Sequence, residues 1–328
     1  MPAAAGHHAR VSYLWENDTN GNPDFATSSP DDTDHKPFGS DATLNTMEGS
    51  NNAVRVFDPG SREAREVIEQ NFQGSWSVEF TLTNPWFLRG VLHNEVQTSG
   101  TDAPYTHTFN GDIPYSLRIV QGTETVGSER ELLGCVIASM DISATVGGMV
   151  TVTVDGAYAD EAFDGSATLT SQPIVQQRPL HFAHASVSRG GSTLSLIQNA
   201  SLSIDNNTDL IPELGTRTAV DYSPKQRTAD IQYGDIVEDT DEVQRMYGGS
   251  TATSPEATVE NTEDIVFTFD NGQTGEDKNS LTLTLNDAFP DSYGRSGAGD
   301  PESDLEGTLS EMAPSIAAEA DNDAASAR

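Results

Sequence analysis

The sequence predicts an all-β, mainly antiparallel fold of the sandwich or barrel type. From Trp76 onward, apolar and polar residues alternate over short runs, and these runs follow one another without helices between them. In the first run Trp76, Val78 and Phe80 share one face, and Pro85 lies just beyond its end. Further candidate strands cover residues 115–120, 135–146, 149–158, 180–187, 194–205, 228–236, 264–269 and 281–285.

The N-terminal region has a different character. Residues 1–50 lack a periodic pattern and are rich in Asn, Asp, Pro, Gly and Thr, which is typical of a long loop. We expect an extended N-terminal arm that contacts another subunit, with Lys36 and Phe38 among the inter-subunit residues. Deleting the arm should then leave a folded monomer that does not polymerise. After it, Ser61 is placed to cap a short helix over residues 62–70, the one helix that the pattern predicts.

A first hairpin is predicted around Gly147 and Gly148. The strand on each side of these glycines has one apolar face and one face of Ser, Thr and Asp. Because cross-strand partners share a face, a two-residue turn would pair apolar with polar residues, whereas a three-residue loop over 146–148 matches the faces. The predicted partners on the polar face are Ser143 with Thr151, Asp141 with Thr153, and Ser139 with Asp155.

A second hairpin repeats this pattern. Its strands, 201–205 and 228–233, again have one apolar face and one face of small polar and acidic residues, which suggests a weak internal duplication. The connection over residues 206–227 is long enough to reach a neighbouring subunit, with Leu214 and Arg217 as candidate inter-subunit residues.

The polar faces of the two hairpins lack Lys and Arg. One interpretation is an ordinary solvated sheet face. The other is the wall of an aqueous channel, because a conduit for duplex DNA should lack cations that hold phosphates. The candidate lumen-facing residues are Asp141, Ser143, Thr153, Asp155, Ser203, Asp205, Thr228 and Asp230.

The C-terminal region, residues 293–328, is rich in Gly, Ser, Asp, Glu and Ala and has no strong period. We expect it to be mobile alone and to order on a partner. The chain thus divides into an arm (1–50), a first β-rich half (51–175), a second β-rich half (176–292) and an acidic, low-complexity tail (293–328).

Charge sets the expected environment. The chain has 51 Asp plus Glu against 17 Lys plus Arg, a formal net charge of −34. Self-repulsion on this scale opposes folding at low salt, but molar salt shortens the Debye length to about 3 Å, so we expect a halophilic protein that depends on high salt. The alternative is a disordered acidic chain, against which the alternating strands argue. Such acidity also disfavours docking on nucleic acid phosphates or anionic lipid.

The sequence contains no motif of a catalytic or metal site and no signal peptide or membrane-spanning segment. The single cysteine, Cys135, lies in an apolar run and is interpreted as a buried small residue. No nucleophile elbow, phosphate loop or zinc helix occurs, so we expect no enzymatic activity, no cofactor and no metal. The N-terminus contains no apolar stretch long enough for a signal peptide and no later run could span a membrane, so we expect the chain to mature in the cytoplasm without membrane insertion.

Five ordered features resemble a known family. They are residues 36–41, residues 55–62, the Trp76 strand with its Asn-Pro-Trp end, the Gly134-Cys135 strand entry and residues 199–207. In order, spacing and composition, from about residue 10 to 290, they are similar to the major tail tube proteins of long-tailed haloarchaeal viruses. Residues 294–328 lie outside this resemblance.

The resemblance implies a virion protein without an active site. Its subunits would close into rings, and the rings would stack into a hollow tail tube around a tape-measure protein, with terminator and baseplate proteins at the ends. Viral double-stranded DNA would later pass through the lumen without specific binding. Such rings are hexamers in many viruses, whereas a duplicated subunit forms a trimer with pseudo-six-fold symmetry, which the two related hairpins favour.

Other functions remain open from the sequence. A virion adhesin or baseplate-type sandwich protein that binds a host surface would share the acidic, β-rich character but should form small closed oligomers. A capsid protein should have a long spine helix, which the pattern lacks. A polysaccharide-acting enzyme should show convergent catalytic residues, which are also lacking.

Overall fold

The computed structural model describes residues 9–16, 24–26, 35–92, 95–111, 113–123, 128–164, 177–237, 239–249, 251–257, 262–298, 300 and 304–325. The helices are α1 (Leu88–Val91), α2 (Asp241–Tyr247) and two 3-10 turns, η3 (Phe182–His184) and η4 (Gly275–Asp277). The strands are β1 (Ala9–Trp15), β2 (Ser40–Ser50), β3 (Val54–Phe57), β4 (Ala64–Ile68), β5 (Gln73–Thr81), β6 (Glu95–Ser99), β7 (Tyr105–Asn110), β8 (Leu117–Thr123), β9 (Ser128–Thr145), β10 (Thr151–Tyr158), β11 (Asp160–Asp164), β12 (Ser186–Arg189), β13 (Ser192–Thr193), β14 (Ile197–Asp205), β15 (Asp209–Pro212), β16 (Ala219–Ser223), β17 (Thr228–Ile236), β18 (Glu263–Asp270), β19 (Ser280–Ser296), β20 (Glu306–Ala313) and β21 (Ser315–Asn322).

The all-β, antiparallel prediction is therefore confirmed. The described strands form extended sheets, and these do not close into a barrel. The longest series of neighbouring strands runs in the order β2-β5-β10-β9-β14-β17-β20-β19, with every neighbour antiparallel. We call these eight strands the central sheet.

Two long strands connect the central sheet to flanking sheets. The first part of β9 pairs with β8 and β11, and its second part enters the central sheet. The first part of β19 likewise pairs with β18 and β21 before its end joins β20. A left-handed backbone occurs along each strand, at Gly134 (φ 63°) and at Asp287 (φ 51°). At Gly134 a side chain would also meet Phe25 at 2.8 Å, so glycine is required there.

The core lies between the central sheet and the flanking sheets. Alternate residues of the central strands, such as Val78, Ile142 and Val152, are buried, as the period of two requires. Trp76 is 1% exposed and its indole Nε1 donates to the Ala157 carbonyl oxygen at 3.1 Å, which satisfies its only polar atom.

The central sheet consists of two similar halves. In the first, β2 is followed by a separate hairpin (β3–β4), then β5, α1, β9 and β10; in the second, β14 is followed by a separate hairpin (β15–β16), then β17, α2, β19 and β20. The spatial order is also the same, β2-β5-β10-β9 and then β14-β17-β20-β19. The sequence had suggested a duplication that matches the two predicted hairpins to each other; the strand order instead matches β9–β10 to β19–β20.

The prediction of an extended N-terminal arm is wrong for the described residues. Strand β1 pairs with β8, and β2 forms an edge of the central sheet. Tyr13, Trp15 and Phe38 are at most 5% exposed and belong to the core. Each such aromatic side chain stabilises the fold by about 1.5–3 kcal/mol when buried. Deletion of residues 1–50 would therefore unfold the subunit rather than leave a competent monomer.

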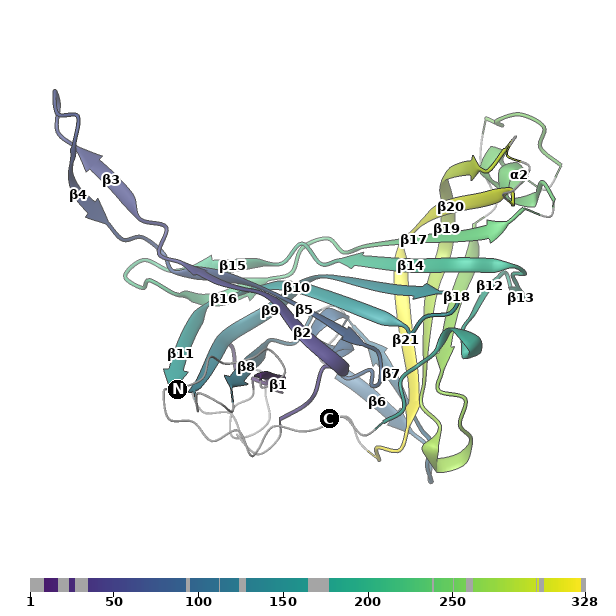
Figure 1. Ribbon diagram of the computed structural model, residues 1–328, viewed down its shortest axis with the longest axis horizontal. Helices are drawn as coiled ribbons and strands as arrows, with labels where there is room; N and C mark the ends of the chain where they lie inside the picture. The colour runs from purple at the N-terminus through teal and green to yellow at the C-terminus, as the bar shows by residue number, and fades with distance from the viewer. Residues whose placement is uncertain are drawn as a thin grey trace.

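The prediction of a helix after Ser61 is also wrong. Residues 64–68 form β4, which pairs with β3 across the turn at Asp58–Gly60, where Gly60 has φ 86°. The β-branched residues of both strands favour this ribbon over the helix that the cap suggested. In Figure 1 the β3–β4 hairpin projects beyond the rest of the molecule, on the side opposite α2.

The expected mobile tail is ordered instead. The end of β19 places residues 293–296 in the central sheet, and β20 and β21 place residues 306–313 and 315–322 in the central and flanking sheets. The pattern escaped detection because its buried residues are small: Ala318 and Ala320 are at most 2% exposed, whereas Glu319 between them is exposed. The strand predicted over 180–187 is wrong in part, because η3 occupies its centre and β12 begins only at Ser186.

Candidate functional site

The polar sides of the two predicted hairpins lie on one face of the central sheet. The register predicted for the first hairpin is confirmed, with Asp141 opposite Thr153. In the second hairpin, for which no pairing was predicted, Ser203 lies opposite Asp230. The sequence did not show that the hairpins are neighbours: β9 pairs with β14, which sets Asp141 opposite Ser203. One row of side chains therefore crosses four strands from Thr153 to Asp230.

Two further rows lie beside it, and we call the three rows together the polar face. The second row is Asp155, Ser139, Asp205 and Thr228, and the third is Thr151, Ser143, Ser201, Gln232 and Ser310. All eight candidate lumen residues belong to the polar face. Asp141, Ser143, Thr228 and Asp230 are exposed, and Thr153, Asp155, Ser203 and Asp205 are half-buried.

The polar face carries negative charge without a cation. Its rows contain four Asp residues and no Lys or Arg. Asp141 and Asp230 lie two strands apart, a separation of roughly 10 Å. That separation is about one Debye length at 0.1 M salt and three at 1 M, so repulsion between these carboxylates fades as salt rises. The face presents a field that weakly repels other anions.

An apolar pair ends the polar face at the β19 side. Met312 pairs with Asp230 across β17 and β20 and with Phe289 across β20 and β19. Met312 is 45% exposed and Phe289 is 38% exposed. Because this pair lies at the outer strand of the sheet, it marks a margin where another surface is suited to cover it.

The four candidate inter-subunit residues differ in their exposure to solvent. Lys36 and Phe38 are buried within their own subunit, at 6% and 0% exposure. The backbone of Lys36 forms a β-bridge with Tyr13 of β1. Neither residue therefore presents a surface to another subunit. Leu214 is fully exposed in the turn between β15 and β16. Arg217 of the same turn is half exposed, but it forms an ion pair with Glu69 at 3.1 Å within the chain.

The projecting β3–β4 hairpin is a second exposed apolar surface, which the sequence pattern did not reveal because it was interpreted as a helix. Val54, Phe57, Val67 and Ile68 are each 45–59% exposed. An isolated two-stranded ribbon is marginally stable in water, so exposed side chains of this size indicate a surface that is covered in an assembly.

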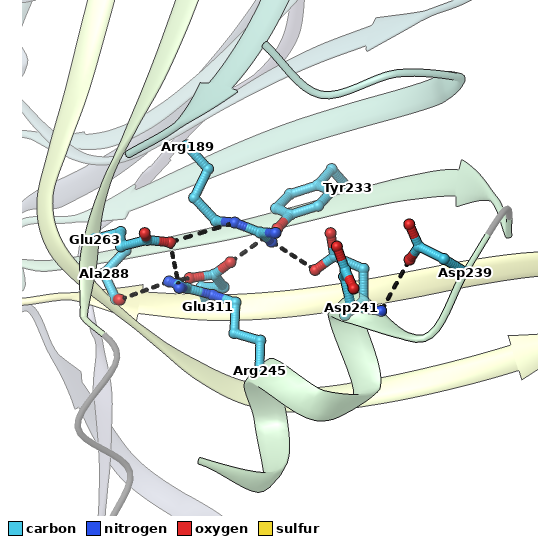
Figure 2. Close-up of polar contacts among 9 residues, drawn as sticks. Arg189, Tyr233, Asp239, Asp241, Arg245, Glu263, Ala288 and Glu311 are labelled. Carbon is cyan, nitrogen blue, oxygen red and sulfur yellow. Dashed lines mark hydrogen bonds and ion pairs between the residues drawn. The ribbon is translucent and has the colours of Figure 1, made fainter. Parts of the chain in front are cut away.

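A buried charge network stabilises the second half (Figure 2). Arg245 of α2 donates to Glu311 of β20 at 2.9 Å, to Glu263 of β18 at 2.7 Å and to the Ala288 carbonyl oxygen at 3.2 Å. Glu311 has no exposed side-chain surface and also accepts from the Tyr233 hydroxyl at 2.8 Å.

The network extends through Arg189 of β12, which donates to the Tyr233 hydroxyl at 3.1 Å and to Glu242 of α2 at 2.6 Å. Burial and the neighbouring Glu311 raise the pKa of Tyr233 far above its usual range, so its hydroxyl stays a donor. Sequence reasoning missed this network because its side chains come from five separate elements: α2, β12, β17, β18 and β20. These ion pairs join α2 to β12, β18 and β20 and so hold the helix against the sheets. We interpret the network as structural.

Glu16 is a second buried acid. Its carboxylate accepts from the Gly134 amide at 2.7 Å and from the Ala26 amide at 3.0 Å, which holds residues 24–26 against β9. Burial raises the pKa of Glu16 to about 7. Cys135 beside it is buried, as predicted, and burial raises the pKa of its thiol.

Within the described ranges, no group of three or more His, Cys, Asp or Glu side chains has the geometry of a metal site. Neither described α-helix is long and apolar enough to cross a membrane.

Comparison with known proteins identifies one family. A family model described as phage tail tube protein matches residues 6–288, most of the chain. No curated protein matches the sequence.

Proposed function

The chain belongs to the phage tail tube protein family, and on this premise we propose that it is the subunit of a hollow tail tube that delivers viral double-stranded DNA. Membership makes it a structural component of the virion tail. The proposal adds the tube lumen, the ring and the partners, and assigns the chain no enzymatic activity and no cofactor.

The polar face is the single observation that supports the conduit. Duplex DNA carries one negative charge per roughly 1.7 Å of its axis, and each phosphate bound by Lys or Arg adds to the affinity and slows passage. A lumen wall therefore works best without cations. Across four neighbouring strands the polar face has only Ser, Thr, Gln and Asp, with the hydrophobic core directly behind it.

The two halves of the central sheet favour a particular ring. Each chain supplies two four-stranded units, so six units in a ring correspond to three chains. We therefore favour a trimer with pseudo-six-fold symmetry over a hexamer. In the assembled tail, a tape-measure protein would occupy the lumen before DNA does, and terminator and baseplate proteins would bind the two ends.

Exposed apolar hairpins suit the stacking of rings. The β3–β4 hairpin and Leu214 of the β15–β16 turn project from equivalent positions in the two halves, and in Figure 1 both hairpins extend to the same side. The formal charge of −34 supports assembly in concentrated salt, as in a haloarchaeal host, with formation of the tube in the cytoplasm.

Electron microscopy of the purified chain in molar salt tests the proposal. We expect stacked rings or hollow tubes at high protein concentration, with three-fold or six-fold symmetry in end views. Monomers or small closed oligomers at every concentration would contradict the tube and favour an adhesin or baseplate-type protein.

The position of the polar face is tested by thiol labelling of assembled tubes. Cys135 is buried, so Ser143→Cys on the polar face and Ser99→Cys on β6 each introduce one accessible thiol. A maleimide on a large polymer should modify Ser143→Cys in dissociated subunits but not in tubes, whereas Ser99→Cys should react in both. Equal reaction of both variants in tubes would show that the polar face is not the lumen.

A further inference from the structure

The central sheet ends in two edge strands. Within the described residues, β2 pairs only with β5, and the end of β19 (residues 289–296) pairs only with β20. Both edges are solvent-accessible, since Glu48 and Ser50 of β2 and Ser292, Gly294 and Ser296 of β19 are exposed. Unpaired edges of this length are templates for pairing with another chain.

The chain already contains one joint between its two halves. We call each four-stranded half a unit. In the spatial order of the sheet, β9 is the outermost strand of the first unit, and it pairs with β14, the adjacent outermost strand of the second unit. If two chains join in the same way, β19 of one takes the place of β9, and β2 of the next takes the place of β14. The internal joint therefore predicts the register of the joint between chains.

The two units are aligned by pairs that occur at the same place in each. Strands β5 and β17 each end at a residue that pairs with the first residue of the next strand in the sheet, Thr81 with Thr151 and Ile236 with Glu306. From this anchor, the row Thr46, Ser77, Asp155 and Ser139 in the first unit corresponds to the row Ser201, Gln232, Ser310 and Ser292 in the second.

The register follows from these rows. At the internal joint, Ser139 lies opposite Asp205, four residues beyond Ser201. The equivalent of Ser139 is Ser292, and the residue four beyond Thr46 is Ser50.

We propose that β19 of one chain pairs antiparallel with β2 of a second copy, with Ser292 opposite Ser50, Gly294 opposite Glu48, and Ser296 opposite Thr46. This inference rests on the proposed tube function and specifies how its ring is joined. The contact is heterologous, since different strands of the two copies meet, and repeated contacts of this kind form a ring where the rotation between copies closes.

Chemistry at the edges is compatible with this register. Each predicted pair lies on the side of the sheet that carries the polar face, and none sets two carboxylates opposite each other, because Glu48 faces a glycine. On the core side the register sets half-buried Tyr293 beside Gly49 and half-buried Met47 beside Arg295, so apolar surface that is partly open in the monomer becomes covered.

The helices leave this edge open. Helix α1 contacts β9, and α2 contacts β19. Because β9 pairs with β14 in the presence of α1, contact between a helix and the corresponding strand β19 is compatible with the addition of a further strand.

Disulfide trapping tests the register. The variant Glu48→Cys, Gly294→Cys puts two thiols opposite each other across the joint, and a Cβ at Gly294 would meet open space. Opposite residues in an antiparallel pair lie about 4.5–5.5 Å apart, within the range of a disulfide. The matched control, Glu48→Cys with Ser292→Cys, offsets one thiol by two residues on the same face, about 7–8 Å away and beyond that range.

Mild oxidation of assembled protein in molar salt should convert most of the test variant into covalent oligomers on a denaturing gel, and at least tenfold less of the control. Tubes that assemble without this cross-link, or an equal yield from both variants, would overturn the β2–β19 joint while the tube function stands. A chain that remains monomeric in molar salt, as measured by light scattering, would overturn both.

Discussion

The buried network around Arg245 allows a quantitative test of what stabilises the second half. Replacing Arg245 with Ala removes the donor that Glu311 meets at 2.9 Å, in a place where Glu311 has no exposed side-chain surface. Loss of one partner from a buried ion pair costs about 3–5 kcal/mol, because the remaining charge is left without compensation. The Tyr233 hydroxyl still donates to Glu311 and keeps the cost within this range.

The expected change in melting temperature follows from chain length. If all 328 residues unfold as one unit, the unfolding entropy of about 2.1 cal/mol/K per residue converts this loss into a decrease of about 4–7 °C. The assay is thermal unfolding in molar salt, followed by circular dichroism. The matched control is Arg65→Ala, which breaks a surface pair with Asp58 and should cost about 0.5 kcal/mol or less.

A double variant separates the charge from the packing. Arg245→Met with Glu311→Leu removes both charges, and such replacements are often neutral or stabilising. We expect it to recover more than half of the loss, because Tyr233 still accepts from Arg189 and Glu263 still contacts Arg189. A double variant that is as unstable as the sum of the two single variants would refute the reasoning, since the loss would then come from packing.

Three further predictions concern pH, assembly and salt. Because the pKa of Glu16 is raised to about 7 in the folded state, its stabilising contribution should be complete below about pH 4.5 and lost by about pH 7, a fall of about 3 kcal/mol. Denaturant titrations at several pH values should show this slope in wild type and a flatter one in Glu16→Gln, and equal slopes would contradict the assignment. Replacing residues 54–68 with Gly-Gly should cost the monomer less than about 1 kcal/mol yet abolish tubes in electron micrographs, and normal tubes would exclude the hairpin from stacking. With a net charge of −34, the melting temperature should rise steadily between 0.2 and 2 M KCl, and a flat profile would contradict the role of charge repulsion.

Local alternation was sufficient to predict most of the central strands, the register of the first hairpin and the polar face of the second. Matching faces across Gly147 and Gly148 determined a three-residue loop, and the pairing of Asp141 with Thr153 followed. The pairing of β9 with β14 was not predictable in this way, because residues 146–196 separate the two strands and such a distant pairing leaves no local periodicity.

The errors have a common physical cause, which is that tertiary contacts outweighed local signals. Phe38 lies in a segment with the composition of a loop, yet the core buries it completely. Strand β21 buries Ala318 and Ala320, whose small side chains give little hydrophobic contrast. The cap at Ser61 was a valid local signal for a helix, but pairing between β3 and β4 decided the conformation.

The joint between β9 and β14 also bears on the kinetics of assembly. It forms within a single chain, where the two strands meet at the effective concentration of a tethered pair rather than by diffusion. In a ring built from such chains, every second joint is therefore complete when the subunit has folded. Nucleation then requires fewer independent encounters than it would for six separate units, and its rate should depend on a lower power of subunit concentration.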